Sequence, residues 1–279
     1  MLKRILTGAV AVCVLLPVLF FSHTIVFPIA IAVISVVALW ELFKCIGISQ
    51  KLLTTFPSYC AAIIFPFLLR YVQSTMKVAM IAAIFALLYL IYLFALIVWS
   101  HWKFAFNEAL TAYAMTLYML LALNSIIYIR DYGDIGKYVY LLIFVGAWIT
   151  DTFAYFTGML IGKHKLIEDV SPKKTIEGSI GGIVFCALSF AAFGLIMDNF
   201  FEREANILFL IICGIIISVI SQIGDLIMSV IKRHYKIKDF GKIFPGHGGI
   251  IDRFDSIFAV SIGFVCIFMF VALTGIKLL

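Results

Sequence analysis

Long apolar segments, separated by short groups of charged residues, follow one another along almost the whole chain. Several are close to the ~20 residues that an α-helix needs to cross the hydrocarbon core of a bilayer. The pattern therefore predicts an all-α, polytopic integral membrane protein with about nine transmembrane helices. The apolar runs are 5–21, 25–40, 52–69, 78–100, 109–129, 138–162, 180–197, 205–230 and 256–276. The first two are short and share a tight loop, so they form either a full or a shallow hairpin.

Composition agrees with a membrane protein and excludes a water-soluble fold. Of the 279 residues, 64% are hydrophobic and 13% are charged, and the mean hydropathy is +1.15. A soluble domain typically has about 45–50% apolar and about 25% charged residues. No polar linker separates two halves, so we expect one integral membrane domain over 1–279. Within it, 1–137 supply scaffold helices and 138–279 carry the expected active site. Six isolated cysteines with apolar neighbours favour free thiols over disulfides or a zinc site.

The basic residues predict the orientation of the helices. Lys and Arg number 15 on the side that includes the N-terminus and 6 on the other side. The positive-inside rule therefore places the N-terminus in the cytoplasm and the C-terminus outside. Both long basic loops, near 163–179 and 231–255, then face the cytoplasm, where nucleotides are found. We expect a multi-pass protein of the cell membrane, and the short chain without a targeting extension favours a bacterial source.

Two aspartates lie within the apolar runs, where a charge costs at least ~2.5–3.5 kcal/mol on insertion scales. Asp151 lies in the middle of the sixth run, with Tyr155 and Gly158 on the same helical face. Asp225, near the cytoplasmic end of the eighth run, is part of a longer polar stripe at helical spacing. The stripe consists of Ser218, Gln222, Asp225, Ser229 and Lys232.

Polar side chains within a membrane either join helices by hydrogen bonds or serve a function. For Asp225 the spacing favours function, because Lys232 and a carboxylate-rich loop follow it. Ser218 and Gln222 fit the two roles equally well. Asp151 is intermediate, since it could simply pair with a lysine of a neighbouring loop.

The densest group of charges, 229–255, lies between the last two apolar runs. Asp252 and Asp255 are three residues apart there, so a helix that includes both places their carboxylates on one face. With Asp225, three carboxylates could then converge at the cytoplasmic surface. Oxygen ligands beside phosphates suit Mg²⁺, and a second cation could share the site. The alternative is a helix-capping pair with Arg253 as counterion, but the glycine-rich PGHGG lies just before it.

The glycines of this segment suit phosphate binding. Gly246, Gly248 and Gly249 surround His247 and allow backbone N–H groups to approach a phosphate closely. His247 could contact that phosphate or move a proton. The alternative is an ordinary turn with a hydrogen-bonded histidine.

The cations have two interpretations as well. The other basic loop contains Ser171-Pro172-Lys173-Lys174-Thr175, which binds phosphate or anchors the chain at the membrane surface, with equal support. In the last segment, Lys236 and Lys242 are best explained by contact with anionic lipid headgroups. Lys232 and Arg233 are the better candidates for substrate contact. The basic residues are not interleaved with aromatics, so no nucleic-acid partner is expected.

At these residues the chain resembles the phosphatidate cytidylyltransferases (CDP-diacylglycerol synthases). The main signature covers 27 residues and consists of Ser229-x-Ile231-Lys232-Arg233, Lys238-Asp239, Gly241, Phe244-Pro245, His247-Gly248-Gly249 and Asp252-Arg253-Phe254-Asp255. Further matches are Asp151-Thr152, Ala154-Tyr155, Ser171 to Thr175, Glu177-Gly178 and Gly224-Asp225. The resemblance thus spans about 151–255, and 1–137 add only a compatible hydropathy.

The resemblance implies that CTP and phosphatidate give CDP-diacylglycerol and pyrophosphate, with Mg²⁺ required. It implies that Asp225, Asp252 and Asp255 serve the metal centre, with Lys232 nearby. We expect phosphate contacts from Lys232 and Arg233, contacts to the lipid phosphate or the CTP tail from the SPKKT loop, and a pocket shaped by the GHGG loop. The remaining substrate-binding candidates are Thr175, Arg253 and Asp151.

Two rival functions fit the residues less well. A CTP-dependent lipid-alcohol kinase would use similar membrane and nucleotide chemistry. A cation or proton transporter could use Asp151 and Asp225 as relays, although transport explains the GHGG and DRFD motifs poorly. The oligomeric state stays open, and a homodimer is compatible with the sequence.

Overall fold

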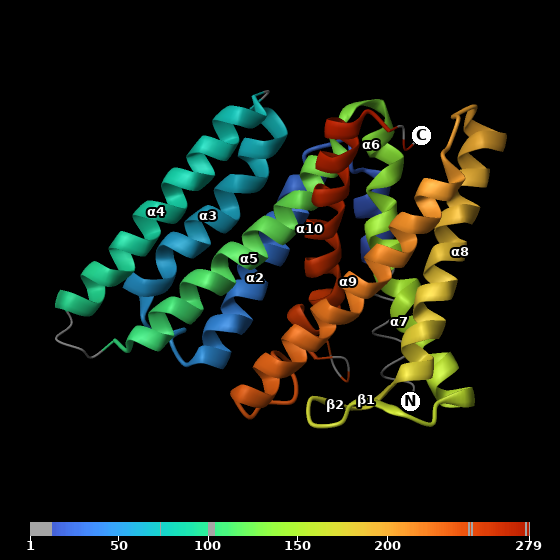
Figure 1. Cartoon of the computed structure of the whole chain (residues 1–279). Coiled ribbons are helices and arrows are strands. Elements are labelled where there is room, and N and C mark those ends of the chain that lie inside the picture. The colour runs from blue at the N-terminus through green and yellow to red at the C-terminus, as the bar shows by residue number, and fades with distance from the viewer. Residues whose placement is uncertain are drawn as a thin grey trace. The chain divides into compact units, whose positions relative to one another are not determined.

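The computed structural model describes residues 13–72, 74–99, 104–244, 246, 248–276 and 278, which are mostly helical (Figure 1). Eight helical segments in this part of the chain are long and apolar enough to cross a membrane. They are α2 (Val26–Ile46), α3 (Leu52–Tyr71), α4 (Thr75–Trp99), α5 (Phe106–Arg130), α6 with α7 (Gly133–Ile161), α8 (Ile176–Phe201), α9 (Ile207–His234) and α10 (Ile251–Thr274). The predicted all-α polytopic class is confirmed, and eight of the nine apolar runs have a counterpart. Of the first run, 5–21, residues 5–12 lie outside the described residues, and residues 13–20 are helical.

The chain forms two compact units, and each unit combines two separate stretches of the sequence. The first comprises residues 1–128 and 235–253, and the second comprises 129–234 and 254–279. In the first unit, α2 packs against α3, and α3 packs against α4. Residues 235–253 complete this unit with the glycine-rich loop and the first turn of α10.

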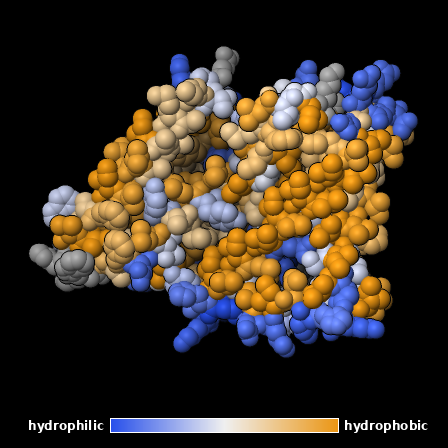
Figure 2. Space-filling view, viewed as in Figure 1, coloured by the Kyte–Doolittle hydropathy of each residue, from blue (hydrophilic) through white to orange (hydrophobic). Residues whose placement is uncertain are grey.

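The second unit contains α6 (Gly133–Val139), α7 (Leu141–Ile161), α8, α9 and most of α10. Its α8 packs along both α7 and α9, and α7 also contacts α9. Apolar side chains cover the outer faces of α8 and α9 in Figure 2, as expected for helices in contact with lipid. Hydrophilic residues gather at the helix ends of this unit.

A short β-hairpin joins α7 to α8, where the sequence indicated only a basic loop. Its strands are β1 (Lys165–Ile167) and β2 (Ser171–Thr175), paired antiparallel with Lys165 opposite Thr175. The hairpin was not predicted because strands of three and five residues are too short for a clear alternating pattern. Pro172 is tolerated because each strand of a two-stranded sheet has a free edge.

Hydrogen bonds fix the hairpin to the start of α8. The Glu177 carboxylate accepts the backbone N–H of Lys163 (3.1 Å) and contacts His164 Nδ1 (2.7 Å). Thr175 is the N-cap of α8, and its hydroxyl accepts the Gly178 N–H at 3.1 Å. Ser and Thr are favoured at this position because they satisfy a backbone donor that the helix leaves unpaired. β2 therefore leads directly into α8 through Thr175.

Candidate active site

A cavity of about 280 Å³ lies within the second unit, where α7, the hairpin, α8 and α9 meet. Figure 2 shows hydrophilic atoms in a hollow between the apolar surfaces of α8 and α9, just above the hairpin. The polar side chains of its wall are Asp151, Tyr155, Lys173, Lys174, Thr175, Ser179, Gln222 and Asp225. Met159 and Leu166 add apolar surface. Asp151 and Asp225, together with Lys173, Lys174 and Thr175 of the SPKKT loop, were all predicted site residues, and the fold brings them together.

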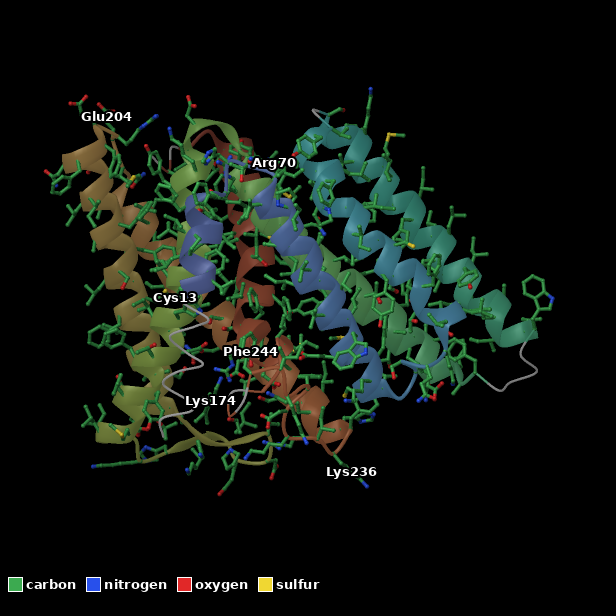
Figure 3. All side chains as sticks on the ribbon, turned by 180° about the vertical axis from the view of Figure 1, so that it is seen from behind. Cys13, Arg70, Lys174, Glu204, Lys236 and Phe244 are labelled. Atoms are coloured by element: carbon green, nitrogen blue, oxygen red, sulfur yellow. The ribbon has the colours of Figure 1, made fainter. Side chains whose placement is uncertain are left out.

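The central contact of the cavity is an ion pair between Lys174 and Asp225. The Lys174 ammonium contacts Asp225 Oδ2, and the two side chains are only 24% and 22% exposed. Figure 3 shows Lys174 at the hairpin end of the unit. Because both side chains are partly buried, water screens the attraction between their charges less than it would at the open surface. The pair fixes an anion-binding ammonium group and a cation-binding carboxylate side by side.

Some residues of the polar stripe on α9 bond to neighbouring helices, and others line the cavity. Thr150 of α7 donates a hydrogen bond to Ser218 Oγ at 3.0 Å, and Gln222 Nε2 donates to the Ser179 carbonyl of α8 at 3.2 Å. These bonds join α9 to its two neighbours, so interhelical bonding explains Ser218 fully. Gln222 also lines the cavity. One turn further on, Asp225 faces the cavity instead of a helix.

A second carboxylate cluster adjoins Asp225 at the start of α10. Ser256 Oγ donates a hydrogen bond to Asp151 Oδ2 at 3.0 Å, and Asp255 Oδ1 accepts the Ser256 N–H at 3.0 Å. Asp225, Lys232 and Asp151 are the charged groups that act on the half-buried Asp255 carboxyl. Three carboxylates from α7, α9 and α10 therefore share one electrostatic environment. The sequence did not predict that Asp151 would bond to Ser256, because serine next to Asp255 carried no distinctive signal.

The other predicted cations of this unit differ in their surroundings. Lys173 is exposed and lines the cavity, whereas Lys232 is half-buried beside Asp255. Arg233 is exposed at the end of α9, and its Nε donates to the Val170 carbonyl in the hairpin turn at 3.3 Å. Arg233 thus links the end of α9 to the hairpin. Positive residues at a helix C-terminus are also favoured by the helix dipole.

Asp252 lies in the first unit and is tied to its own loop. It is 6% exposed, and its Oδ2 accepts the backbone N–H groups of Phe240 (2.8 Å) and Gly249 (3.0 Å). Gly248 has φ +85°, a left-handed conformation that glycine adopts without strain. Arg253 is exposed. His247 lies outside the described residues.

The oxygen donors of the second unit fit a divalent cation, although they do not form a complete cage. No three His, Cys, Asp or Glu side chains among the described residues are arranged as a ready-made metal site. Mg²⁺ is usually held by one or two carboxylates together with waters and substrate phosphates, so a complete protein cage is not required. Asp225 already holds a cationic group, the Lys174 ammonium, and Asp255 lies close to it. Carboxylate oxygens are the donors that Mg²⁺ prefers.

One buried carboxylate, that of Glu41, was not predicted from the sequence. Glu41 is 0% exposed in α2, and its oxygens accept backbone N–H groups at the start of α10. The available signal was a charge directly after the second apolar run, which resembles an ordinary helix-flanking residue.

Comparison with known proteins gives a consistent result. The cytidylyltransferase family matches residues 2–272. The phosphatidate cytidylyltransferase of Staphylococcus haemolyticus is 34% identical over 253 residues, which are 91% of this chain and 93% of that protein. The phosphatidate cytidylyltransferase of Staphylococcus aureus is 32% identical over the same shares. That of Staphylococcus saprophyticus is 45% identical over 129 residues, 46% of this chain and 48% of that protein.

Proposed function

The chain belongs to the cytidylyltransferase family, and from this we propose that it transfers the cytidylyl group of CTP to phosphatidate, giving CDP-diacylglycerol and pyrophosphate. The relatives that match nearly the whole chain carry the name of this activity. The single structural observation that supports the proposal most is the cavity with the Lys174–Asp225 pair. The Lys174 ammonium could bind phosphate oxygens, and the carboxylates beside it could bind a metal ion.

The reaction is an in-line displacement at phosphorus. An oxygen of the phosphatidate phosphate monoester forms a bond to the α-phosphorus of CTP. The bond from that phosphorus to the oxygen bridging the α and β positions breaks, and pyrophosphate leaves. The attacking phosphate is already anionic near neutral pH, so the site needs no strong general base. Positioning and neutralisation of charge supply most of the rate enhancement in phosphoryl transfers of this kind.

We assign the phosphate contacts to the lysines that surround the cavity. Lys174 is held by Asp225 and presents its ammonium at the cavity wall, and Lys173 lies next to it. Lys232 lies close enough to Asp255 for its positive charge to act on that carboxylate. Arg233 supports the hairpin through Val170 and can hold a phosphate oxygen with its remaining donors. Thr175 and Gln222 complete the polar wall.

Mg²⁺ is proposed as the cofactor, with Asp225 and Asp255 as the residues that hold it. When bound, it would neutralise charge on the triphosphate and stabilise the leaving pyrophosphate. Asp151 holds Ser256 and so orients the residue that follows Asp255. Asp252 remains a predicted ligand, and its observed contacts give it a second role, since it joins Phe240 to Gly249. A second cation remains a prediction.

The protein is a multi-pass membrane protein, and we propose that the hairpin end of the second unit faces the cytoplasm. Lysines gather on this end, as the positive-inside rule requires. CTP would enter from water at the hairpin, and the acyl chains of phosphatidate would remain in lipid beside the apolar faces of α7 and α8. The site takes both substrates at the membrane surface.

The decisive experiment follows two labels of CTP. Purified protein in detergent is incubated with phosphatidate and CTP labelled at the α or the γ phosphate, with and without Mg²⁺. We expect the α label in lipid and the γ label in pyrophosphate, only with Mg²⁺. Transfer of the γ label to a lipid alcohol would instead identify a kinase, and ion flux in liposomes without either reaction would favour a transporter.

Site variants belong in the same assay. Asp225→Asn removes the carboxylate that holds Lys174, so α-label transfer should fall by at least about 100-fold, as for loss of one preorganised charged group in other enzymes. Glu204→Gln is a matched control, because Glu204 is exposed at the opposite end of the unit (Figure 3). Equal activity of the two variants would contradict the proposed site.

A further inference from the structure

Glu41 is a charged residue in an unusual environment. Its side chain is fully buried in the last turns of α2, within a segment apolar enough to span a membrane. Burial of a carboxylate costs several kcal/mol unless hydrogen bonds or counter-charges compensate. The contacts of Glu41 should therefore show what it does.

Both carboxylate oxygens of Glu41 bind the start of α10. Oε1 accepts the Ile250 N–H and Oε2 accepts the Ile251 N–H, each at 3.0 Å. The first N–H groups of a helix have no partner within the helix, and the helix dipole favours a negative charge beside them. Glu41 thus caps α10 from a position more than 200 residues earlier in the chain.

Two glycines of the signature segment make room for this carboxylate. A Cβ atom added to Gly241 or to Gly249 would overlap the Glu41 carboxylate. From its sequence, Gly249 was expected to allow the close approach of a phosphate. The structure gives it another role, because Gly249 lies against Glu41 and donates its N–H to Asp252.

Asp252 holds the same loop from the other side. Its Oδ2 binds the N–H groups of Phe240 and Gly249, so the two ends of the segment 240–249 meet at one carboxylate. Glu41 holds the next two residues, Ile250 and Ile251. Two buried carboxylates therefore hold Phe240, Gly249 and the start of α10, and Asp255 follows one turn later on the same helix.

We propose that Glu41 is a positioning residue, which sets the start of α10 and thereby the places of Asp252 and Asp255. Its role rests on the proposed function, in which these aspartates serve the metal and the substrate phosphates. Groups that orient metal ligands typically change metal affinity or activity by about 10- to 100-fold when they are removed. Glu41 acts through α10 and touches no substrate.

The test compares Glu41→Gln with Glu108→Gln. Glutamine keeps the size of Glu41 but turns an amide N–H towards one of the two backbone donors, so one hydrogen bond is lost. Glu108 is a glutamate of the same unit, 33% exposed and paired with Lys51 at 2.8 Å. We expect Glu41→Gln to raise the Mg²⁺ concentration for half-maximal activity by about 10- to 100-fold, with a smaller change in the KM for CTP, whereas Glu108→Gln should match the parent.

A second readout does not need activity. Hydrogen–deuterium exchange of the peptide covering 240–251 should be at least about 10-fold faster in Glu41→Gln than in the parent, because a lost charged hydrogen bond is worth about 1.5–3 kcal/mol. If the parent transfers no cytidylyl label, the proposed function fails, while the exchange result still tests whether Glu41 holds the start of α10. Unchanged exchange would show that Glu41 does not hold it. Faster exchange with unchanged Mg²⁺ dependence would overturn the positioning role.

A milder variant covers the case in which Glu41→Gln does not fold. Glu41→Asp keeps the charge and adds no bulk, but its carboxylate is one methylene shorter and reaches the two N–H groups less well. The positioning role requires a raised Mg²⁺ half-saturation in this variant too. A value equal to that of the parent in folded Glu41→Asp would contradict it.

Discussion

Adjacent lysines of the SPKKT strand have different roles in the structure. Lys174 is partly buried and paired with Asp225, whereas Lys173 is exposed at the cavity wall. Successive side chains of a β-strand point to opposite faces, which explains why neighbours in sequence have such different surroundings. From the sequence, Lys173 and Lys174 were predicted to bind phosphate together. The conformation of a basic loop is not known from its sequence, so nothing indicated that their roles differ.

This difference predicts unequal effects of alanine substitution. Lys174→Ala leaves the Asp225 carboxylate without its partner and should lower kcat/KM for CTP by about 10- to 100-fold, the worth of a charged hydrogen bond. Lys173→Ala removes only an exposed charge, so it should raise the KM of a phosphate-bearing substrate a few-fold with kcat unchanged. Steady-state kinetics of both variants is the measurement, and equal losses would contradict the asymmetric site.

The charged residues of the site were predictable from the sequence, but their contacts were not. Asp225, Asp151 and the SPKKT lysines were predicted because a charge inside an apolar run requires an explanation. Their partners were not, because the Asp225–Lys174 and Asp151–Ser256 contacts join residues 51 and 105 positions apart in the chain. The loop-holding contacts of Asp252 were missed for the same reason, since both of its donors are backbone groups.

At the scale of elements, two glycines of α8 allow α7 and α8 to pack closely beside the cavity. Gly178 and Gly182 are four residues apart on α8 and face α7, where a Cβ would lie 2.6 Å from the Ala154 carbonyl oxygen and 2.9 Å from the Thr150 carbonyl oxygen, respectively. Small residues at this spacing allow helix backbones to approach closely in membranes. The close approach brings the hairpin, Asp151 and the start of α8 to one place.

Gly182→Ala tests this helix contact without changing a cavity residue. The added methyl meets a backbone oxygen, which cannot move aside as a flexible side chain can, so overpacking should cost about 1–3 kcal/mol of stability. Thermal unfolding in detergent should show a lower midpoint, accompanied by reduced activity. Ala192→Val adds a larger group on the exposed face of the same helix and should leave both unchanged. A Gly182→Ala protein as stable as the parent would refute the close-packing argument.

The elements themselves were predictable except at their ends. Apolar length alone located eight helical spans, because the bilayer requires such lengths. The pattern ended the eighth run at 230, but α9 continues through Lys232, Arg233 and His234, whose charges the helix C-terminus favours. The hairpin was not predicted since its strands are held by Glu177, Thr175 and Arg233, contacts that depend on the folded positions of α8 and α9.

At the scale of the whole molecule, the charged residues at the two ends of the second unit support the proposed orientation in the membrane. Its hairpin end carries lysines and the carboxylate cluster, and the opposite end carries Glu202, Arg203 and Glu204 (Figure 3). Apolar helix surface lies between the two ends. Since polar ends bracket an apolar band, the two ends contact water on opposite sides of the membrane.

The orientation can be measured with single cysteines at the two ends. Glu168→Cys lies in the exposed hairpin turn, and Glu204→Cys lies at the opposite end; neither is a proposed site residue. In intact cells, a membrane-impermeant thiol reagent should label Glu204→Cys above the parent, whose six native cysteines set the baseline. Glu168→Cys should react only after the membrane is permeabilised. Labelling of Glu168→Cys in intact cells would place the cavity outside, away from cytoplasmic CTP, and the positive-inside assignment and the proposed access of the nucleotide would both be wrong.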